Sequence, residues 1–187
     1  DLFRSSAPTM QSAMMEDTGI DFPMALFQKI VKDRPRVRPQ LWQWQERMLD
    51  QAERQGWVEL TPTGQSRHFT NFSRRGGGEA KNMLNEIINF PIQTHAGNTL
   101  LDIQHRLMGI LPNPMARRPR IFQCLNVYDA VYFDCHVDEI ERLRTAVDRA
   151  ITSCGTEGYW QQLQQQTGNC VPLEYDFEVK EDSSVLA

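Results

Sequence analysis

The sequence lacks any apolar run near the ~18 residues that a membrane-spanning helix requires. It also lacks a basic segment followed by an apolar one, which is the pattern of a secretory signal. We therefore expect no membrane partner and a cytoplasmic location. At 187 residues the chain is long enough to bury a core of its own.

Cysteine and histidine are few and widely spaced. The cysteines are Cys124, Cys135, Cys154 and Cys170, and no two of them form a C-x-x-C pair. The four histidines show no H-x-x-x-H spacing either. Because structural zinc sites depend on such pairs, we expect no zinc site, and reduced thiols are the default interpretation for an intracellular chain.

An overall excess of positive charge is also missing: 20 Lys and Arg stand against 24 Asp and Glu, a formal charge of -4. Taken alone, this argues against a nucleic-acid-binding protein. The net charge of the whole chain does not show the local distribution, which includes three basic groups, at residues 29–38, at Arg67 with Arg74 and Arg75, and at 117–120. Such groups fit contacts to phosphates, and a solvated protein surface is an equally good explanation.

Residue periodicity predicts an α+β protein, because helical and strand-like segments alternate irregularly along the chain. Helical patterns are expected at 7–32, 40–55, 79–89, 94–110 and 137–151, with an interruption at Pro91, and strands at 57–69, 121–135 and 171–179. The helix at 40–55 ends where Gly56 supplies a C-terminal cap. The strand at 171–179 is predicted from its alternation of apolar and acidic residues.

Asp129 is the candidate for chemistry, since it is the one carboxylate within the otherwise buried-looking hairpin sequence at 124–133. Asp is depleted in strands and costly to bury without a partner. One explanation is structural: an Asp in a hairpin turn bonds its own backbone. The other is a carboxylate displayed for Mg²⁺, which binds one or two carboxylates together with substrate phosphates. A second carboxylate would then have to come from elsewhere.

Two amides flank Pro91 in the segment Asn89-Phe90-Pro91-Ile92-Gln93. Amide groups donate and accept hydrogen bonds at once, which suits contacts to base edges. An ordinary helix break with satisfied amides is the alternative.

In order along the chain, three segments resemble family A DNA polymerases, the DNA polymerase I type. Residues 89–93 resemble the N-[FM]-P-[IV]-Q segment that opens the long palm helix. Residues 125–131 (Leu-Asn-Val-Tyr-Asp-Ala-Val) resemble motif C. Residues 55–69 resemble the family's R-G-Y-V-E-T…G-R-R-R-Y hairpin. The resemblance covers nearly the whole chain and implies fingers-like helices at 1–56 and a palm-like part with antiparallel hairpins at 57–187.

The resemblance also implies roles for individual residues. Asp129 would be the catalytic, metal-binding aspartate of motif C, in a two-metal Mg²⁺ site. The implied contacts to primer–template DNA are Gln93, Asn89, Arg67, Tyr128, Arg74 and Arg75. The remaining substrate would be a deoxynucleoside triphosphate, in nucleotidyl transfer during DNA replication.

The sequence departs from the family in ways that shape the prediction. Tyr128 and Ala130 stand where the family has His and Glu beside the motif C aspartate, which indicates a divergent member of viral type. The motif A aspartate and the motif B helix are not found. We therefore expect activity only with a partner chain or segment that carries motifs A and B. The alternatives are a non-catalytic DNA-binding or scaffolding subunit, and an unrelated α+β domain.

Overall fold

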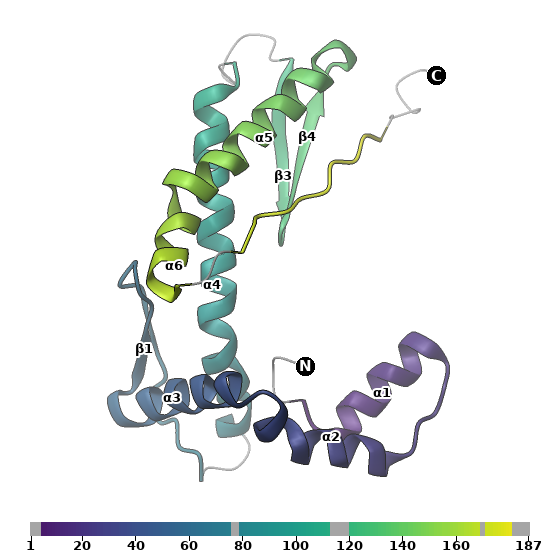
Figure 1. Cartoon of the computed structure of the whole chain (residues 1–187), viewed down its shortest axis with the longest axis vertical. Helices are drawn as coiled ribbons and strands as arrows, with labels where there is room; N and C mark the ends of the chain where they lie inside the picture. The colour runs from purple at the N-terminus through teal and green to yellow at the C-terminus, as the bar shows by residue number, and fades with distance from the viewer. Residues whose placement is uncertain (1–4, 76–78, 113–119, 169–170, 181–187) are drawn as a thin grey trace. The chain divides into compact units, whose positions relative to one another are not determined.

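The computed structural model describes residues 5–75, 79–112, 120–168 and 171–180. Its elements, most of which are labelled in Figure 1, follow in chain order: α1 (Ala7–Thr18), α2 (Met24–Val37), α3 (Pro39–Gln55), β1 (Trp57–Glu59), β2 (Ser66–His68), α4 (Glu79–Ile110), β3 (Ile121–Val127), β4 (Ala130–Cys135), the 3₁₀ helix η1 (Val137–Glu139), α5 (Ile140–Glu157) and α6 (Tyr159–Thr167). The strands form two separate antiparallel pairs, β1–β2 and β3–β4. The predicted α+β class and both hairpins are confirmed.

The chain forms two compact units, Asp1–Gln93 and Thr94–Ala187. This division does not coincide with the expected boundary between residues 56 and 57. The fingers-like and palm-like assignments stay predictions. Of the residues singled out from the sequence, Cys170 and the basic residues of 117–118 lie outside the described part of the chain. No helix among the described residues is both long enough and apolar enough to cross a membrane.

The first unit packs α3, the β1–β2 hairpin and the first part of α4 around one apolar core. Its buried residues are Leu49, Ala52, Val58, Phe69, Phe72, Ile87 and Ile88. Gly56 ends α3 with a left-handed φ of 77°, and its N–H bonds the carbonyl of Ala52. Glycine adopts this conformation without steric cost, so the chain can turn directly from α3 into β1.

In the second unit, the β3–β4 hairpin and α5 pack on the later turns of α4. The buried core residues are Leu107, Ile121, Leu143, Ala146, Val147 and Ala150. The predicted amphipathic helix at 137–151 is confirmed, although it begins with a 3₁₀ turn and continues to Glu157. Its apolar residues recur at three- and four-residue steps and so share the face that covers the hairpin.

The predicted interruption at Pro91 is wrong, because α4 runs unbroken from Glu79 to Ile110. Proline in a helix interior lacks the N–H that would bond the carbonyl four residues earlier, at a cost of ~3 kcal/mol. Ile87 and Ile88, each 0% exposed, lie on the same stretch of the helix, and Pro91 itself is buried. Burial of this apolar face offsets the lost hydrogen bond.

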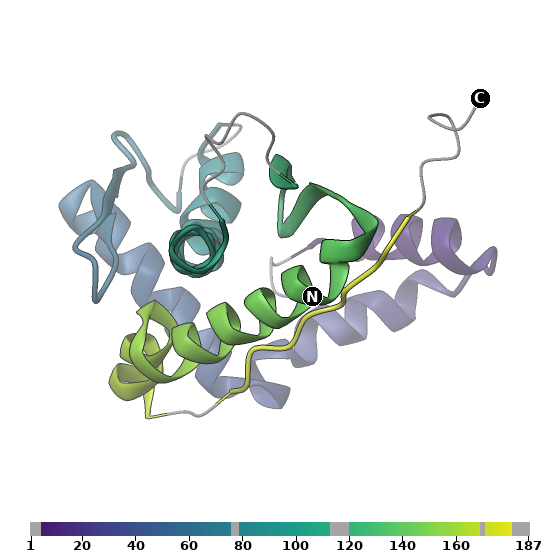
Figure 2. The same ribbon diagram turned by 90° about the horizontal axis from the view of Figure 1, so that it is seen from above.

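The predicted strand at 171–179 is also wrong: residues 171–180 are extended but belong to no sheet. Instead they run along α5, as Figure 2 shows. The Tyr175 hydroxyl bonds the Asp148 carboxylate, and the Arg144 guanidinium stacks on the Phe177 ring at 4.4 Å. Alternating residues predict an extended backbone, but whether it pairs with a strand or lies on a helix depends on its neighbours.

Candidate functional site

The β3–β4 hairpin places Asp129 at its tip. Val127 pairs with Ala130, so Tyr128 and Asp129 form a two-residue loop between the strands. Asp129 is exposed, and its carboxylate makes no hydrogen bond or ion pair within the described residues. The structural explanation predicted a bond from this carboxylate to its own backbone. The described contacts contain no such bond, so the carboxylate is available to an external ligand.

Tyr128 has the less ordinary backbone of the two loop residues, with a φ of +56°. Two-residue hairpin loops use glycine, Asn or Asp at a position of positive φ, because a Cβ atom is strained there by ~1–2 kcal/mol. The Tyr128 side chain is 95% exposed and therefore recovers nothing by packing. A bulky residue held in a strained conformation and fully displayed is typical of a functional position.

The base of the hairpin is fixed to α4. Gln104 is 7% exposed, and its Nε2 donates to the Oδ1 of Asn126 over 2.7 Å. The same oxygen accepts a bond of 3.0 Å from Gln123. Asn126 lies three residues before Asp129, so this pair of amides orients the strand that carries the tip. Gln104 could not be identified from the sequence, because one Gln in a helical pattern carries no signal of its partner.

The outer face of the hairpin is apolar and uncovered. Phe122, Leu125, Val127 and Tyr132 are between 38% and 55% exposed. Leu125 and Tyr132 are direct cross-strand partners, and a bulge at Cys124 shifts the register just before them. Each strand pairs only with the other within the described residues. An exposed apolar face with two open strand edges is typical of a surface that packs against a further element.

The amides of α4 differ in their surroundings. Gln93 is exposed, whereas Asn89 is half-buried and its Oδ1 is a buried acceptor without a hydrogen-bond donor among the described residues. Buried acceptors without a donor are rare in folded proteins. The Asn89 side chain is therefore either set to receive a donor from a ligand or left at an energetic cost.

The predicted arginines also divide into two kinds. Arg67 on β2 pairs with Glu86 over 2.6 Å and stacks on Phe69 at 5.3 Å, with about half of its side chain exposed. Arg75 is exposed.

Arg74, in contrast, is enclosed by carboxylates of α3. It pairs with Glu46 at 2.8 Å, with Glu53 at 3.6 Å and with Asp50. Three carboxylates around one guanidinium offset its charge, so Arg74 is a weaker candidate for a phosphate contact than Arg67 or Arg75, and its contact with DNA stays a prediction. Its contacts with these carboxylates fix the segment after β2 to α3.

A polar network in the second unit joins α4 to the junction of α5 and α6. His95 Nδ1 lies 2.5 Å from the Tyr159 hydroxyl, and Asp102 Oδ2 accepts from the Tyr159 amide at 3.0 Å. Arg106 bonds Asp102 at 3.1 Å and Ser153 at 3.0 Å. The Asp102 and Arg106 side chains of this network fill the space beside Gly158.

Titration of this network follows from its burial. Burial lowers the pKa of His95 and raises the pKa of Cys154 to about 11. Burial also works to raise the pKa of Asp102, but hydrogen bonds from the Tyr159 amide, Cys154 and Arg106 lower it overall. Cys154 is therefore a neutral thiol at physiological pH and is not an activated nucleophile.

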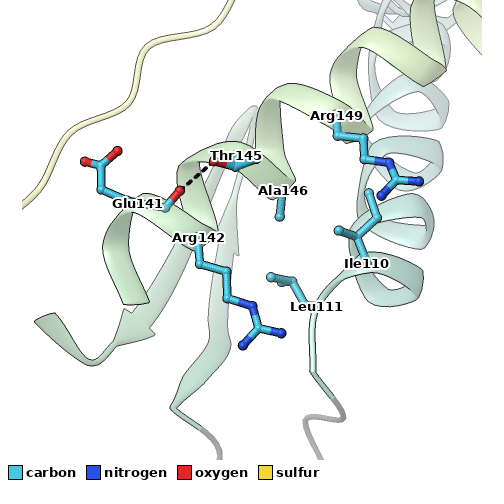
Figure 3. Close-up of a pocket in the computed structure, with 7 residues that line it drawn as sticks. All are labelled: Ile110, Leu111, Glu141, Arg142, Thr145, Ala146 and Arg149. Carbon is cyan, nitrogen blue, oxygen red and sulfur yellow. Dashed lines mark hydrogen bonds between the residues drawn. The ribbon is translucent and has the colours of Figure 1, made fainter. Parts of the chain in front are cut away.

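A hollow of about 390 Å³ lies between the end of α4 and the first turns of α5; Figure 3 shows the residues that line it. Arg142 and Arg149, two helical turns apart, extend to the same side, and Ile110, Leu111 and Ala146 form its apolar floor. Arg142 also pairs with Glu139 at 3.4 Å. None of the predicted site residues lines this hollow, so it takes no part in the hairpin site.

Metal-binding capacity in the described residues is limited to single side chains. No group of three or more His, Cys, Asp or Glu side chains among them is arranged to hold an ion. Asp129 has the right donor type for Mg²⁺, but it supplies one ligand of the several that the ion takes.

Comparison with models of protein families and with curated proteins finds no match to this chain. The interpretation of the hairpin therefore depends on the residues of this chain and on their placement.

Proposed function

We propose that this chain is the C-terminal part of a DNA-directed DNA polymerase of the family A type, with a divergent palm. The observation that carries the proposal is the exposed Asp129 carboxylate at the tip of a hairpin, which has no partner among the described residues and lies within a segment that resembles motif C. The α4 segment with Asn89 and Gln93 precedes it in the order expected for that family. The proposed place of action is the cytoplasm of a bacterium or of an infected host.

In this proposal Asp129 supplies one carboxylate to a Mg²⁺ site that a second aspartate completes. Divalent ions in such sites activate the attacking oxygen and neutralise charge on the transferred phosphoryl group. The second aspartate would come from a chain or segment that carries motifs A and B. The uncovered apolar face of the hairpin and its open strand edges supply a surface on which that element can pack.

A few side chains of this chain would contact the primer–template DNA. Arg67 and Arg75 have exposed guanidinium groups that can contact phosphates, although Arg67 would share its charge with Glu86. Tyr128 displays a ring on which a nucleobase can stack. Gln93 offers an exposed amide. Asn89 Oδ1 lacks a donor among the described residues, but it is buried, so its contact with DNA requires movement of the side chain. Catalysis by this chain then consists of positioning reactants and contributing one negative charge.

Primer extension tests this proposal. The chain is assayed alone and with the chains that co-purify with it from its native source, using a primed template, deoxynucleoside triphosphates and Mg²⁺. We expect extension only in the complex. Robust extension by the 187-residue chain alone would show that the site is not shared.

A non-catalytic DNA-binding or scaffolding subunit is the second candidate. It is favoured by Tyr128 and Ala130 at the positions of the family's His and Glu. This candidate predicts salt-dependent DNA binding that needs neither Mg²⁺ nor Asp129. An unrelated α+β domain predicts no salt-dependent binding of DNA at all.

A further inference from the structure

The first unit contains a second hollow, of about 460 Å³, which we call the α2 groove. Its lining residues come from α1, α2 and α3, and its apolar ones are Met10, Leu26, Ile30, Val37, Leu41 and Trp42. On α2, Leu26 is 45% exposed, Ile30 39% and Val37 67%. These three recur at steps of four and seven residues and form one stripe along the helix.

Basic side chains edge this apolar stripe. Lys29, Arg34 and Arg38 line the groove, against one acidic residue, Asp33. Arg34 is held at the rim by bonds of 2.8 Å to the carbonyl of Ser5 and to the sulfur of Met10. The groove therefore combines an apolar floor with a positive rim.

The combination of an apolar floor and a positive rim distinguishes two possible ligands for the basic residues in 29–38, namely a DNA backbone and a protein helix. A DNA backbone satisfies the positive rim but presents no apolar surface to fill the floor. A protein helix with an apolar stripe and acidic flanks satisfies both. The stripe from Leu26 to Val37 is about 16 Å long at ~1.5 Å per residue, which matches about three turns of a docked helix.

We propose that the α2 groove binds an amphipathic helix of another protein chain, with Asp or Glu on both sides of its apolar stripe. The apolar residues of that helix cover Leu26, Ile30 and Val37. Its carboxylates face Lys29 and Arg38. The inference is independent of the polymerase proposal, because none of these residues belongs to the hairpin site.

The probes are two fluorescein-labelled synthetic helices of 16 residues with the same leucine stripe, one flanked by Glu and the other by Lys. Fluorescence anisotropy is measured with the whole chain at low and moderate salt. We expect saturable binding of the Glu helix, at least about tenfold tighter than binding of the Lys helix. Added salt should weaken binding of the Glu helix, because ions in solution screen the exposed charges of the rim.

Three variants assign the binding to the groove. Ile30→Glu should lower the affinity for the Glu helix at least about tenfold, because it removes an apolar contact and adds repulsion between carboxylates. Leu101→Glu, at a 62% exposed position on α4, is the matched control and should leave binding unchanged. The double variant Lys29→Glu/Arg38→Glu should reverse the preference in favour of the Lys helix, a gain that misfolding cannot produce.

Several results would overturn the proposal. They are equal binding of both helices, no binding of either, or binding that Ile30→Glu leaves intact. Sedimentation that shows an Ile30-dependent dimer of this chain would assign the groove to a second copy. Adsorption to vesicles of phosphatidylcholine and phosphatidylserine that Ile30→Glu abolishes would assign it to a lipid surface. A failed primer-extension assay would bear on the polymerase proposal alone.

Discussion

Gln104 on α4 and Asn126 on β3 share a hydrogen bond of 2.7 Å that joins the long helix to the strand leading to Asp129. The Gln104 side chain is buried, whereas the hairpin beyond Asn126 is exposed on both strands. The hairpin thus has a fixed base and a free tip. An anchored strand with an exposed carboxylate at its end can hold that carboxylate in one place relative to the later turns of α4.

Replacement of Gln104 by Leu should loosen this anchor. Asn126 Oδ1 would keep only the bond from Gln123, and we expect a loss of about 1–2 kcal/mol in the free energy of unfolding. Urea denaturation gives the stability, and hydrogen exchange should show faster exchange in β3 and β4. Gln123→Leu removes the more exposed donor and is the control. Equal effects of the two substitutions would contradict an anchoring role for the buried amide.

Tyr128→Gly should separate stability from DNA binding. Glycine removes the steric strain of a positive φ, but it also raises the conformational entropy of the unfolded chain. The free energy of unfolding should therefore stay constant or rise by up to ~1 kcal/mol. Duplex binding, followed by fluorescence anisotropy, should weaken severalfold because the displayed ring is lost. Tyr132→Gly on β4 is a contrasting variant that should lower stability. Unchanged DNA binding by Tyr128→Gly would remove Tyr128 from the contacts.

Gly158→Ala should destabilise the second unit. A Cβ atom there would lie 2.2 Å from Asp102 Oδ2 and 2.8 Å from Arg106 Nη2, so the polar network must shift. We expect a loss of about 1–3 kcal/mol. A Cβ atom added at Gly155 on α5 would meet open space, so Gly155→Ala should stabilise the helix by about 0.5–1 kcal/mol. Thermal denaturation of both variants checks the difference in sign.

His95 should make the second unit sensitive to mild acid. Burial lowers the pKa of His95 in the folded state below 6.5, so near that pH the unfolded chain binds the proton more readily. Its contribution to stability is present above pH 6.5 and is lost as the pH falls through the folded pKa. The slope cannot exceed about 1.4 kcal/mol per pH unit for one proton.

The control for this pH dependence is His95→Gln, which retains a hydrogen-bonding group beside Tyr159 but does not titrate. Urea unfolding of both proteins between pH 7.5 and about 5 should show a steeper loss for the wild-type chain. Asp102 contributes only at lower pH, since its pKa lies below 3.8. Parallel curves for the two proteins would contradict the role of His95.

The sequence predicts much of the local structure for clear physical reasons. Gly56 ends α3, and the apolar residues of 57–69 and 121–135 form hairpins because alternation and turn residues act locally. Pro91 led to a wrong prediction of a helix interruption, since burial of Ile87 and Ile88 outweighs the missing hydrogen bond. Residues 171–180 mislead in another way. Alternation specifies an extended chain but not its partner, which is α5 here.

In the candidate site too, the local backbone could be predicted from the sequence, whereas contacts with residues distant in the sequence could not. The placement of Asp129 at a hairpin tip could be predicted, because its neighbours are strand-forming residues. Its freedom from hydrogen bonds within the described residues could not, since an Asp in a turn often bonds its own backbone. The partners of Arg74 could not be predicted either, because its three carboxylates lie 21 to 28 residues away along the sequence.

The direct test of the central claim is the turnover of the Asp129→Asn complex in Mg²⁺-dependent primer extension. Asp134→Asn, at an exposed position on β4, is the matched control. We predict that Asp129→Asn lowers the extension rate at least about a hundredfold, with duplex affinity within about twofold of wild type, and that Asp134→Asn retains normal turnover. Near-normal extension by Asp129→Asn, in a complex whose wild-type form is active, would contradict a metal-binding role for this carboxylate.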